Sequence, residues 1–198
     1  MTPQTLPANT LATAILPLDN ALLRNLILAV AGSLLLWISA RVSIPSWPVA
    51  LTRQTLVVLM IGMAFGARLG AATVALYLLE GAAGLPVFSG TPEKGIGLTY
   101  MMSTTGGYLF GFVVAAGAVG FLAERGWDRN LSTTALAMLI GTVLIYIPGV
   151  LWLGMVLGWD KPILSWGLTP FLAGDALKLV IAAVLMPSLW RLLSALKR

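Results

Sequence analysis

Cysteine and histidine are both absent from this sequence of 198 residues. The absence of cysteine excludes disulfide bonds and thiolate chemistry, and the absence of histidine removes the commonest general base and metal ligand. Charge is scarce too: 10% of the residues are charged against 59% hydrophobic, and the mean hydropathy is +0.94. Because soluble proteins lie far from this balance, the composition predicts an integral membrane protein without a metal site.

The net charge of +5 and the pI near 10 could suggest a nucleic-acid partner. However, the 12 Lys and Arg residues are scattered between apolar segments instead of forming a cluster. Basic residues in such places commonly fix the orientation of membrane segments. We therefore expect no nucleic-acid binding.

Six apolar stretches predict an all-α membrane protein, a compact bundle of six transmembrane helices. They cover residues 22–42, 56–67, 69–85, 105–123, 133–157 and 172–196. Four of them reach or approach the ~20 residues that cross a bilayer. The second and third are shorter and meet at Ala67-Arg68-Leu69, which favours a tight hairpin of two crossings, with a re-entrant element as the alternative. We expect one membrane domain, residues 22–198, after a mobile or surface-lying tail, residues 1–21.

The distribution of basic residues predicts that both termini are cytoplasmic, because cytoplasmic loops carry an excess of Lys and Arg. This orientation places seven basic residues inside and four outside: Arg24, Arg68, Arg125, Arg129, Arg191, Lys197 and Arg198 against Arg41, Arg53, Lys94 and Lys161.

Asp175 and Lys178 are charged residues near the start of the last apolar segment. A charge at membrane depth costs roughly 2.5 to 3.5 kcal/mol, so such residues usually face a cavity, pair with each other or hold a ligand. A spacing of three residues places both side chains on one helical face. In the predicted orientation this polar site lies near the outer surface.

The outer connections contain turn-forming and hydrogen-bonding residues. Residues 44–54 contain two prolines and Trp47, followed by the hydrogen-bonding side chains of Thr52, Arg53 and Gln54, and they predict a formed lid. Residues 84–90 and 103–108 combine glycine with apolar and hydroxyl side chains. Ordinary interfacial turns remain an alternative for each connection.

Small residues recur at the spacing of close helix contacts. Gly62, Gly66 and Gly70 form one series, and Gly107 and Gly111 another; both favour packing within the chain. In the first segment, Ala29, Ala31, Gly32 and Ser33 fit internal packing and contact with a partner protein about equally well.

The order and spacing of several motifs resemble one known family over about residues 22–196. The motifs are Ile44-Pro45 through Pro48-Val49, Thr52-x-Gln54, Gly62, Gly66-Ala67-Arg68-Leu69-Gly70, Tyr77, Gly84-Leu85-Pro86-Val87-Phe88-Ser89, Thr105-Gly106-Gly107-Tyr108-Leu109-x-Gly111-Phe112 and Gly174-Asp175-x-x-Lys178. The sequence is similar to BioY, the biotin-specific S component of energy-coupling-factor (ECF) transporters.

The resemblance implies six helices in the cell membrane and a biotin pocket on the extracellular side, under the first and third outer loops. It also implies partners, namely a transmembrane T protein and two ATPases, and no cofactor besides the transported biotin. The expected ligand-binding residues are Trp47, Thr52, Gln54, Val87, Phe88, Ser89, Tyr108, Asp175 and Lys178. The expected partner contacts are Ala29, Ala31, Gly32 and Ser33.

Some positions depart from the family pattern. Ala50 and Thr104 stand where the family commonly has Pro, and Arg53 and Glu80 stand where less polar residues are expected. Gly90 stands where some members carry a polar side chain that helps bind the ligand.

Two functions from different classes remain. The favoured one is a membrane subunit that captures biotin and depends on an ATP-driven partner, or on self-association, for transport. The other is a small intramembrane enzyme or an assembly factor that uses Asp175 and Lys178. Residues 90–95 lack the glycine and lysine spacing of a P-loop, so we expect no ATP hydrolysis by this chain.

Overall fold

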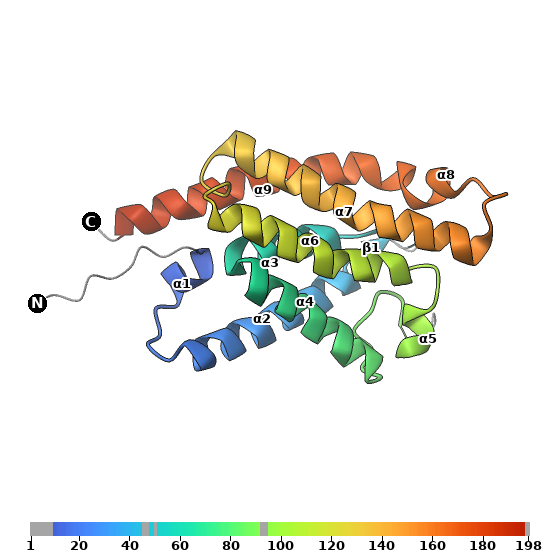
Figure 1. Cartoon of the computed structure of the whole chain (residues 1–198), viewed down its shortest axis with the longest axis horizontal. Coiled ribbons are helices and arrows are strands. Elements are labelled where there is room, and N and C mark those ends of the chain that lie inside the picture. Colours follow the sequence, from blue (N-terminus) through green and yellow to red (C-terminus); the bar gives the residue numbers. More distant parts are fainter. Residues whose placement is uncertain (1–9, 45–47, 50, 92–94, 197–198) are drawn as a thin grey trace, which may run out of the picture.

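The computed structural model describes residues 10–44, 48–49, 51–91 and 95–196. Most of these residues are helical (Figure 1). The helices are α1 (Leu11–Ile15), α2 (Ala21–Arg41), α3 (Gln54–Phe65), α4 (Ala67–Ala82), α5 (Leu98–Met101), α6 (Gly106–Glu124), α7 (Leu131–Leu157), α8 (Ile163–Gly167) and α9 (Thr169–Leu196). Two short strands, β1 (Ser43–Ile44) and β2 (Leu51–Thr52), pair antiparallel with Ser43 opposite Thr52.

Each of the six apolar stretches forms one of the longer helices: α2, α3, α4, α6, α7 or α9. Four segments of the described chain are long and apolar enough to cross a membrane: 21–41, 106–124, 131–157 and 163–196. The expectation of a helical membrane protein is confirmed to that extent. Helices α3 and α4 have only 12 and 16 residues, so six crossings stay a prediction.

The junction between α3 and α4 lies at Gly66, one residue before the expected break. Gly66 has a φ of 85°, a backbone conformation that glycine adopts without steric cost. Across the junction, a Cβ atom added to Gly70 would lie 2.8 Å from the Gly62 Cα, and one added to Gly62 would lie 2.5 Å from the Ala116 carbonyl oxygen. The glycine series therefore packs α3 against α4 and α6, which confirms its internal role.

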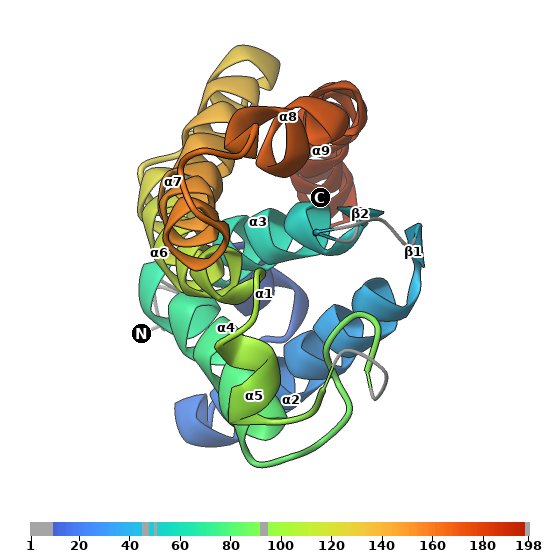
Figure 2. The same ribbon diagram turned by 90° about the vertical axis from the view of Figure 1, so that its right-hand side faces the viewer.

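The bundle is organised around α6, which packs against α3, α4 and α7, while α9 packs against α7 and α2 against α4 (Figures 1 and 2). At one end lie α1, the α3–α4 junction, the α6–α7 loop and the last turns of α9; we call this the α1 end. Helices α5 and α8 lie at the opposite end, which we call the loop end.

Part of the predicted N-terminal tail packs on the bundle. Helix α1 contacts α3 and α9, and Leu11 is only 1% exposed. The Thr10 hydroxyl caps α1 by accepting a hydrogen bond from the Thr13 backbone N–H. Residues 10–15 therefore contribute to the core near the α1 end.

Candidate ligand-binding site

Asp175 and Lys178 form the expected pair on one face of α9. The Lys178 Nζ lies 2.9 Å from the Asp175 Oδ1, and Asp175 is buried. The other carboxylate oxygen, Oδ2, accepts a hydrogen bond from the Tyr146 hydroxyl of α7. Both oxygens of the buried carboxylate are therefore hydrogen bonded, which is what makes its burial tolerable.

Lys178 also connects α9 to the base of the predicted lid. Its Nζ donates to the Thr52 carbonyl oxygen at 3.1 Å and to the Thr55 Oγ1 at 2.8 Å. The three hydrogen bonds of the ammonium group match its three donors. Residues from β2, α3, α7 and α9 thus form a single polar network.

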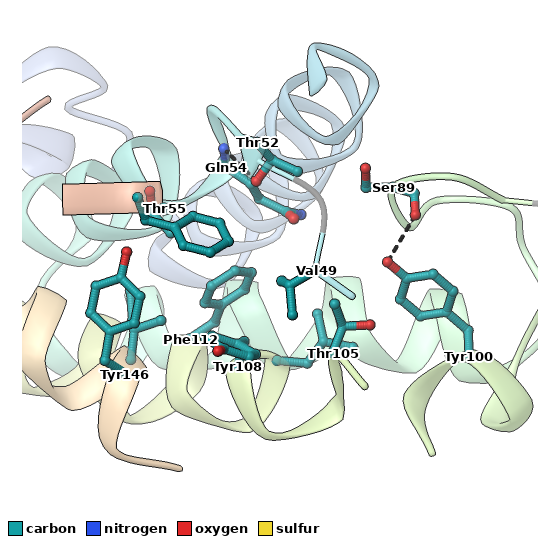
Figure 3. A pocket seen from close by; sticks show the side chains of 13 residues that line it. Val49, Thr52, Gln54, Thr55, Ser89, Tyr100, Thr105, Tyr108, Phe112 and Tyr146 are labelled. Carbon is teal, nitrogen blue, oxygen red and sulfur yellow. Dashed lines mark hydrogen bonds between the residues drawn. The ribbon is translucent and has the colours of Figure 1, made fainter. Parts of the chain in front are cut away.

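An apolar cavity lies next to this network, between α3, α6 and α7 and toward the loop end (Figure 3). The space open to the centre of a water-sized sphere is ≈ 50 Å³. An apolar cavity with few polar groups is typical of small-molecule sites. Its lining consists of Val49, Thr52, Gln54, Thr55, Ser89, Tyr100, Thr105, Tyr108, Leu109, Phe112, Ile145, Tyr146 and Phe171.

The charged pair lies behind the wall of this cavity. A smaller recess of ≈ 10 Å³ is lined by Asp175 and Lys178 together with Thr55. Thr55 lines both spaces, and Tyr146 lines the main cavity while its hydroxyl binds Asp175. A ligand in the main cavity would reach the pair by displacing one of these two side chains.

Ser89 offers a free polar group at the cavity. Its side chain is buried, and its Oγ has no hydrogen-bond partner among the described residues. Gln54, also buried, donates to the Leu36 carbonyl oxygen over a long 3.5 Å. An unpaired buried polar group costs about 1 to 3 kcal/mol, so the Ser89 hydroxyl is a strong candidate for ligand contact.

Hydrogen bonds hold the connections at the loop end together. The Thr104 hydroxyl donates to the Pro48 carbonyl oxygen at 2.8 Å, which joins the α5–α6 connection to the lid. The Tyr100 hydroxyl donates to the Ser89 carbonyl oxygen at 2.8 Å, and burial raises the pKa of Tyr100, so this donor keeps its proton. Arg41, at the end of α2, donates to the Pro86 carbonyl oxygen at 2.6 Å.

Two expected ligand residues, Val87 and Phe88, do not line the cavity. Phe88 is 1% exposed and stacks on Tyr100 with ring centroids 4.8 Å apart. The Val87 carbonyl oxygen accepts a hydrogen bond from the Tyr77 hydroxyl at 2.8 Å. Both residues fix the loop that carries Ser89.

The other expected ligand residues lie at the cavity or outside the described chain. Of these, the residues that line it are Thr52, Gln54, Ser89 and Tyr108. The Tyr108 hydroxyl already donates a hydrogen bond to the Gly167 carbonyl oxygen at 2.8 Å. Trp47 falls outside the described residues, so the lid over the ligand stays a prediction.

Besides Thr104, which donates to Pro48, three departures from the family pattern lie among the described residues. Arg53 is exposed, and Glu80 accepts a hydrogen bond from the Ser33 hydroxyl at 3.0 Å. Gly90 has a φ of 79°, in the left-handed region that glycine favours.

Tyr146 and Thr55 are two polar members of the site that the sequence did not indicate as ligand-binding residues, and Tyr100 and Thr105 are two others. Tyr146 lies 29 residues from Asp175 in a long apolar helix, and Thr55 lies 123 residues from Lys178. The only feature of the sequence that could have indicated them is a polar side chain within an apolar segment. The aromatic wall residues Phe112 and Phe171 carry no such signal.

The four small residues of α2 divide into two groups. Gly32 and Ser33 are buried, and a Cβ added to Gly32 would lie 2.5 Å from the Thr73 Cγ2 of α4. Ala29 is half-buried, and Ala31 is exposed. Of the expected partner contacts, Gly32 and Ser33 thus serve the packing of α2 on α4.

Comparison with known proteins defines the family. The sequence model of the BioY family matches residues 8–195. The chain belongs to the BioY family. It is 36% identical over 163 residues to the biotin transporter BioY of Thermotoga maritima, covering 82% of this chain and 94% of the relative. It is 40% identical over 147 residues to the biotin transporter BioY of Rhizobium etli, covering 70% and 76%.

A solved structure supports the fold of this BioY chain. The 2.1 Å crystal structure of the S component for biotin from an ECF-type ABC transporter superimposes with a TM-score of 0.74. The match covers 88% of this chain and 94% of the other at 21% identity. It therefore shows that the two chains share a fold.

Proposed function

We propose that this chain is the substrate-binding membrane subunit of a biotin uptake transporter. The observation that carries the proposal is the apolar cavity beside the Asp175 and Lys178 network, in a chain of the BioY family. The relatives from Thermotoga maritima and Rhizobium etli are both named biotin transporters. Those names favour transport over an intramembrane enzyme or an assembly factor.

The chemistry of biotin fits the groups around the cavity. Its fused rings need apolar walls, which Phe112 and Phe171 supply. Its ureido group has N–H donors for the Asp175 carboxylate and an oxygen for Lys178 or the Ser89 hydroxyl. An analogue without one of these groups would leave a buried partner unpaired, which gives selectivity.

Binding of biotin would rearrange the empty site. Lys178 already has three acceptors within the chain, so a ligand group can bind it only by replacing one of them. In the proposed cycle, the lid around Trp47 opens, Lys178 exchanges an acceptor of its own chain for the ligand, and the lid closes.

Transport would require partners. The chain has no P-loop, so we propose that a T protein with two ATPases supplies the energy, with self-association as the alternative. We also propose that six segments cross the cell membrane with both termini in the cytoplasm. The loop end then faces outward, and the α1 end meets the cytoplasm.

Equilibrium binding tests the function directly. We expect the purified chain in detergent, without ATP, to bind labelled biotin saturably at one site. Excess unlabelled biotin should compete, whereas an analogue that lacks the ureido carbonyl should compete much less. Absence of saturable binding by a folded sample would overturn the proposal.

A further inference from the structure

A second cavity lies at the α1 end, remote from the proposed biotin site. The space open to the centre of a water-sized sphere is ≈ 590 Å³, so it is much roomier than the biotin cavity. Its walls come from the start of α1, the first turns of α2, the α3–α4 junction and the end of α6, which gather at this end (Figure 1). The lining residues are Thr10, Ala12, Thr13, Arg24, Asn25, Leu28, Phe65, Ala67, Arg68, Leu69, Phe121 and Glu124.

Three charged residues line this cavity: Arg24, Arg68 and Glu124. The ion pairs found among the described residues include none of them. The Nε of Arg24 is buried and has no hydrogen-bond partner within the described chain. A buried guanidinium N–H without an acceptor is costly, so the cavity is suited to an occupant that supplies one.

A hydrogen bond to the backbone of α4 holds the Glu124 side chain in position. The Glu124 Oε1 accepts a hydrogen bond from the Ala67 N–H at 2.8 Å, at the first residue of α4. One carboxylate thus stands in the same cavity as two guanidinium groups. The pattern is complementary to an occupant that carries an anion and a cation together.

The remaining walls are apolar and adjoin the outer surface of the bundle. Leu28, Phe65, Leu69 and Phe121 line the cavity, and α2 presents a largely apolar exposed surface beside it. Since α2 is long enough to cross a bilayer and Arg24 lies in its first turns, the cavity lies at the depth of lipid headgroups.

We propose that this cavity binds the headgroup of a phosphatidylethanolamine molecule. Arg24 and Arg68 hold the phosphate through charge-assisted hydrogen bonds, and the ammonium group faces Glu124. The acyl chains leave the cavity along Leu28 and the outer surface of α2. An acidic peptide would meet the Glu124 carboxylate unfavourably, so the charges favour a zwitterionic lipid.

Native mass spectrometry with defined lipids tests the site. We expect phosphatidylethanolamine to bind the detergent-solubilised chain more tightly than phosphatidylglycerol, and diacylglycerol to bind least. Arg24→Gln and Arg68→Gln should each weaken phosphatidylethanolamine binding about fivefold. Arg24→Lys should lose less than Arg24→Gln, because it keeps the charge. Glu124→Gln keeps an acceptor for Ala67 and should abolish the preference for the ethanolamine head.

Arg191→Gln is the matched control, because Arg191 is exposed near the same end and does not line the cavity. The proposal is overturned if Arg24→Gln binds phosphatidylethanolamine like the wild type, or if diacylglycerol binds equally well. Displacement of the lipid by inorganic phosphate alone would identify a free-phosphate site instead. Biotin binding should be unchanged in all these variants. The lipid-site proposal can therefore fail without affecting the proposed transport function.

Discussion

Lys178 joins two parts of the chain that lie far apart in the sequence. Its ammonium group holds the Asp175 carboxylate, the Thr52 carbonyl oxygen and the Thr55 hydroxyl together, and Tyr146 donates to the same carboxylate. At the scale of single residues, the polar groups of this network already have hydrogen-bond partners within the chain. A ligand can bind them only by replacing one of those partners. The Ser89 hydroxyl is the exception, because it has no hydrogen-bond partner within the part of the chain that the structure describes.

We expect Asp175→Ala and Lys178→Ala each to weaken biotin binding by about 1 to 3 kcal/mol, because each leaves a buried polar partner unsatisfied. Tyr146→Phe should have a smaller effect in the same direction, since the carboxylate keeps its bond to Lys178. Titration with labelled biotin measures all three. Asp160→Ala is the control, because Asp160 is exposed and forms an ion pair with Lys161 away from the site. Wild-type affinity in both Asp175→Ala and Lys178→Ala would remove the pair from the site.

Ser89→Ala separates ligand contact from fold stability. Because the Ser89 hydroxyl is buried with no partner among the described residues, its loss removes an unfavourable group and should raise, not lower, the melting temperature of the empty protein. Biotin binding should weaken by about 0.5 to 1.5 kcal/mol, the net value of one hydrogen bond. Thermal unfolding with and without biotin tests both parts. Unchanged stabilisation by biotin would show that this hydroxyl does not contact the ligand.

At the scale of elements, α2 has two distinct faces. The face with Gly32 and Ser33 packs on α4, and the Ser33 hydroxyl donates to Glu80 at 3.0 Å. Ala31 lies on the exposed face, beside large apolar side chains that include Leu34 and Leu35. A partner helix could therefore approach α2 at Ala31 but not at Ser33.

We expect Ala31→Trp to leave the stability and biotin binding of the isolated chain intact but to disrupt co-purification with a T protein and ATPases, together with ATP-dependent uptake. Ser33→Trp is the contrasting variant: overpacking the buried face should cost about 1 to 3 kcal/mol of stability. Pull-down and melting experiments on both variants distinguish the two faces. Normal assembly of Ala31→Trp would place the partner surface elsewhere.

At the scale of the whole molecule, the basic residues mark the two ends of the bundle. Arg24, Arg68, Arg125 and Arg129 belong to segments at the α1 end, while Lys161 follows α7 at the loop end. This arrangement agrees with the proposed orientation, in which the α1 end, with its excess of positive charge, faces the cytoplasm.

Cysteine labelling tests this orientation without background, since the chain has no native cysteine. In intact cells, a membrane-impermeant maleimide should modify Lys161→Cys. Arg125→Cys should react only after the membrane is made permeable. Both positions are exposed in the fold, so burial does not explain a lack of reaction. The reverse pattern would invert the proposed topology.

Composition and local pattern determined much of this protein. The apolar stretches located the longer helices to within a few residues, because each depends mainly on its own hydrophobicity and length. The pairing of Asp175 with Lys178 followed from their spacing on one helix. The glycine series indicated close packing, and the order of short motifs indicated the family.

Only the tertiary structure decided which distant residues meet. The approach of Tyr146 and Thr55 to the charged pair depends on how α7 and α3 pack against α9, which no local pattern encodes. The same packing buries Phe88 in the core and leaves the Ser89 hydroxyl without a partner among the described residues. It also turned Ser33 toward α4 while Ala31, two residues away, stayed exposed, because the rotation of a helix about its axis is set by its neighbours.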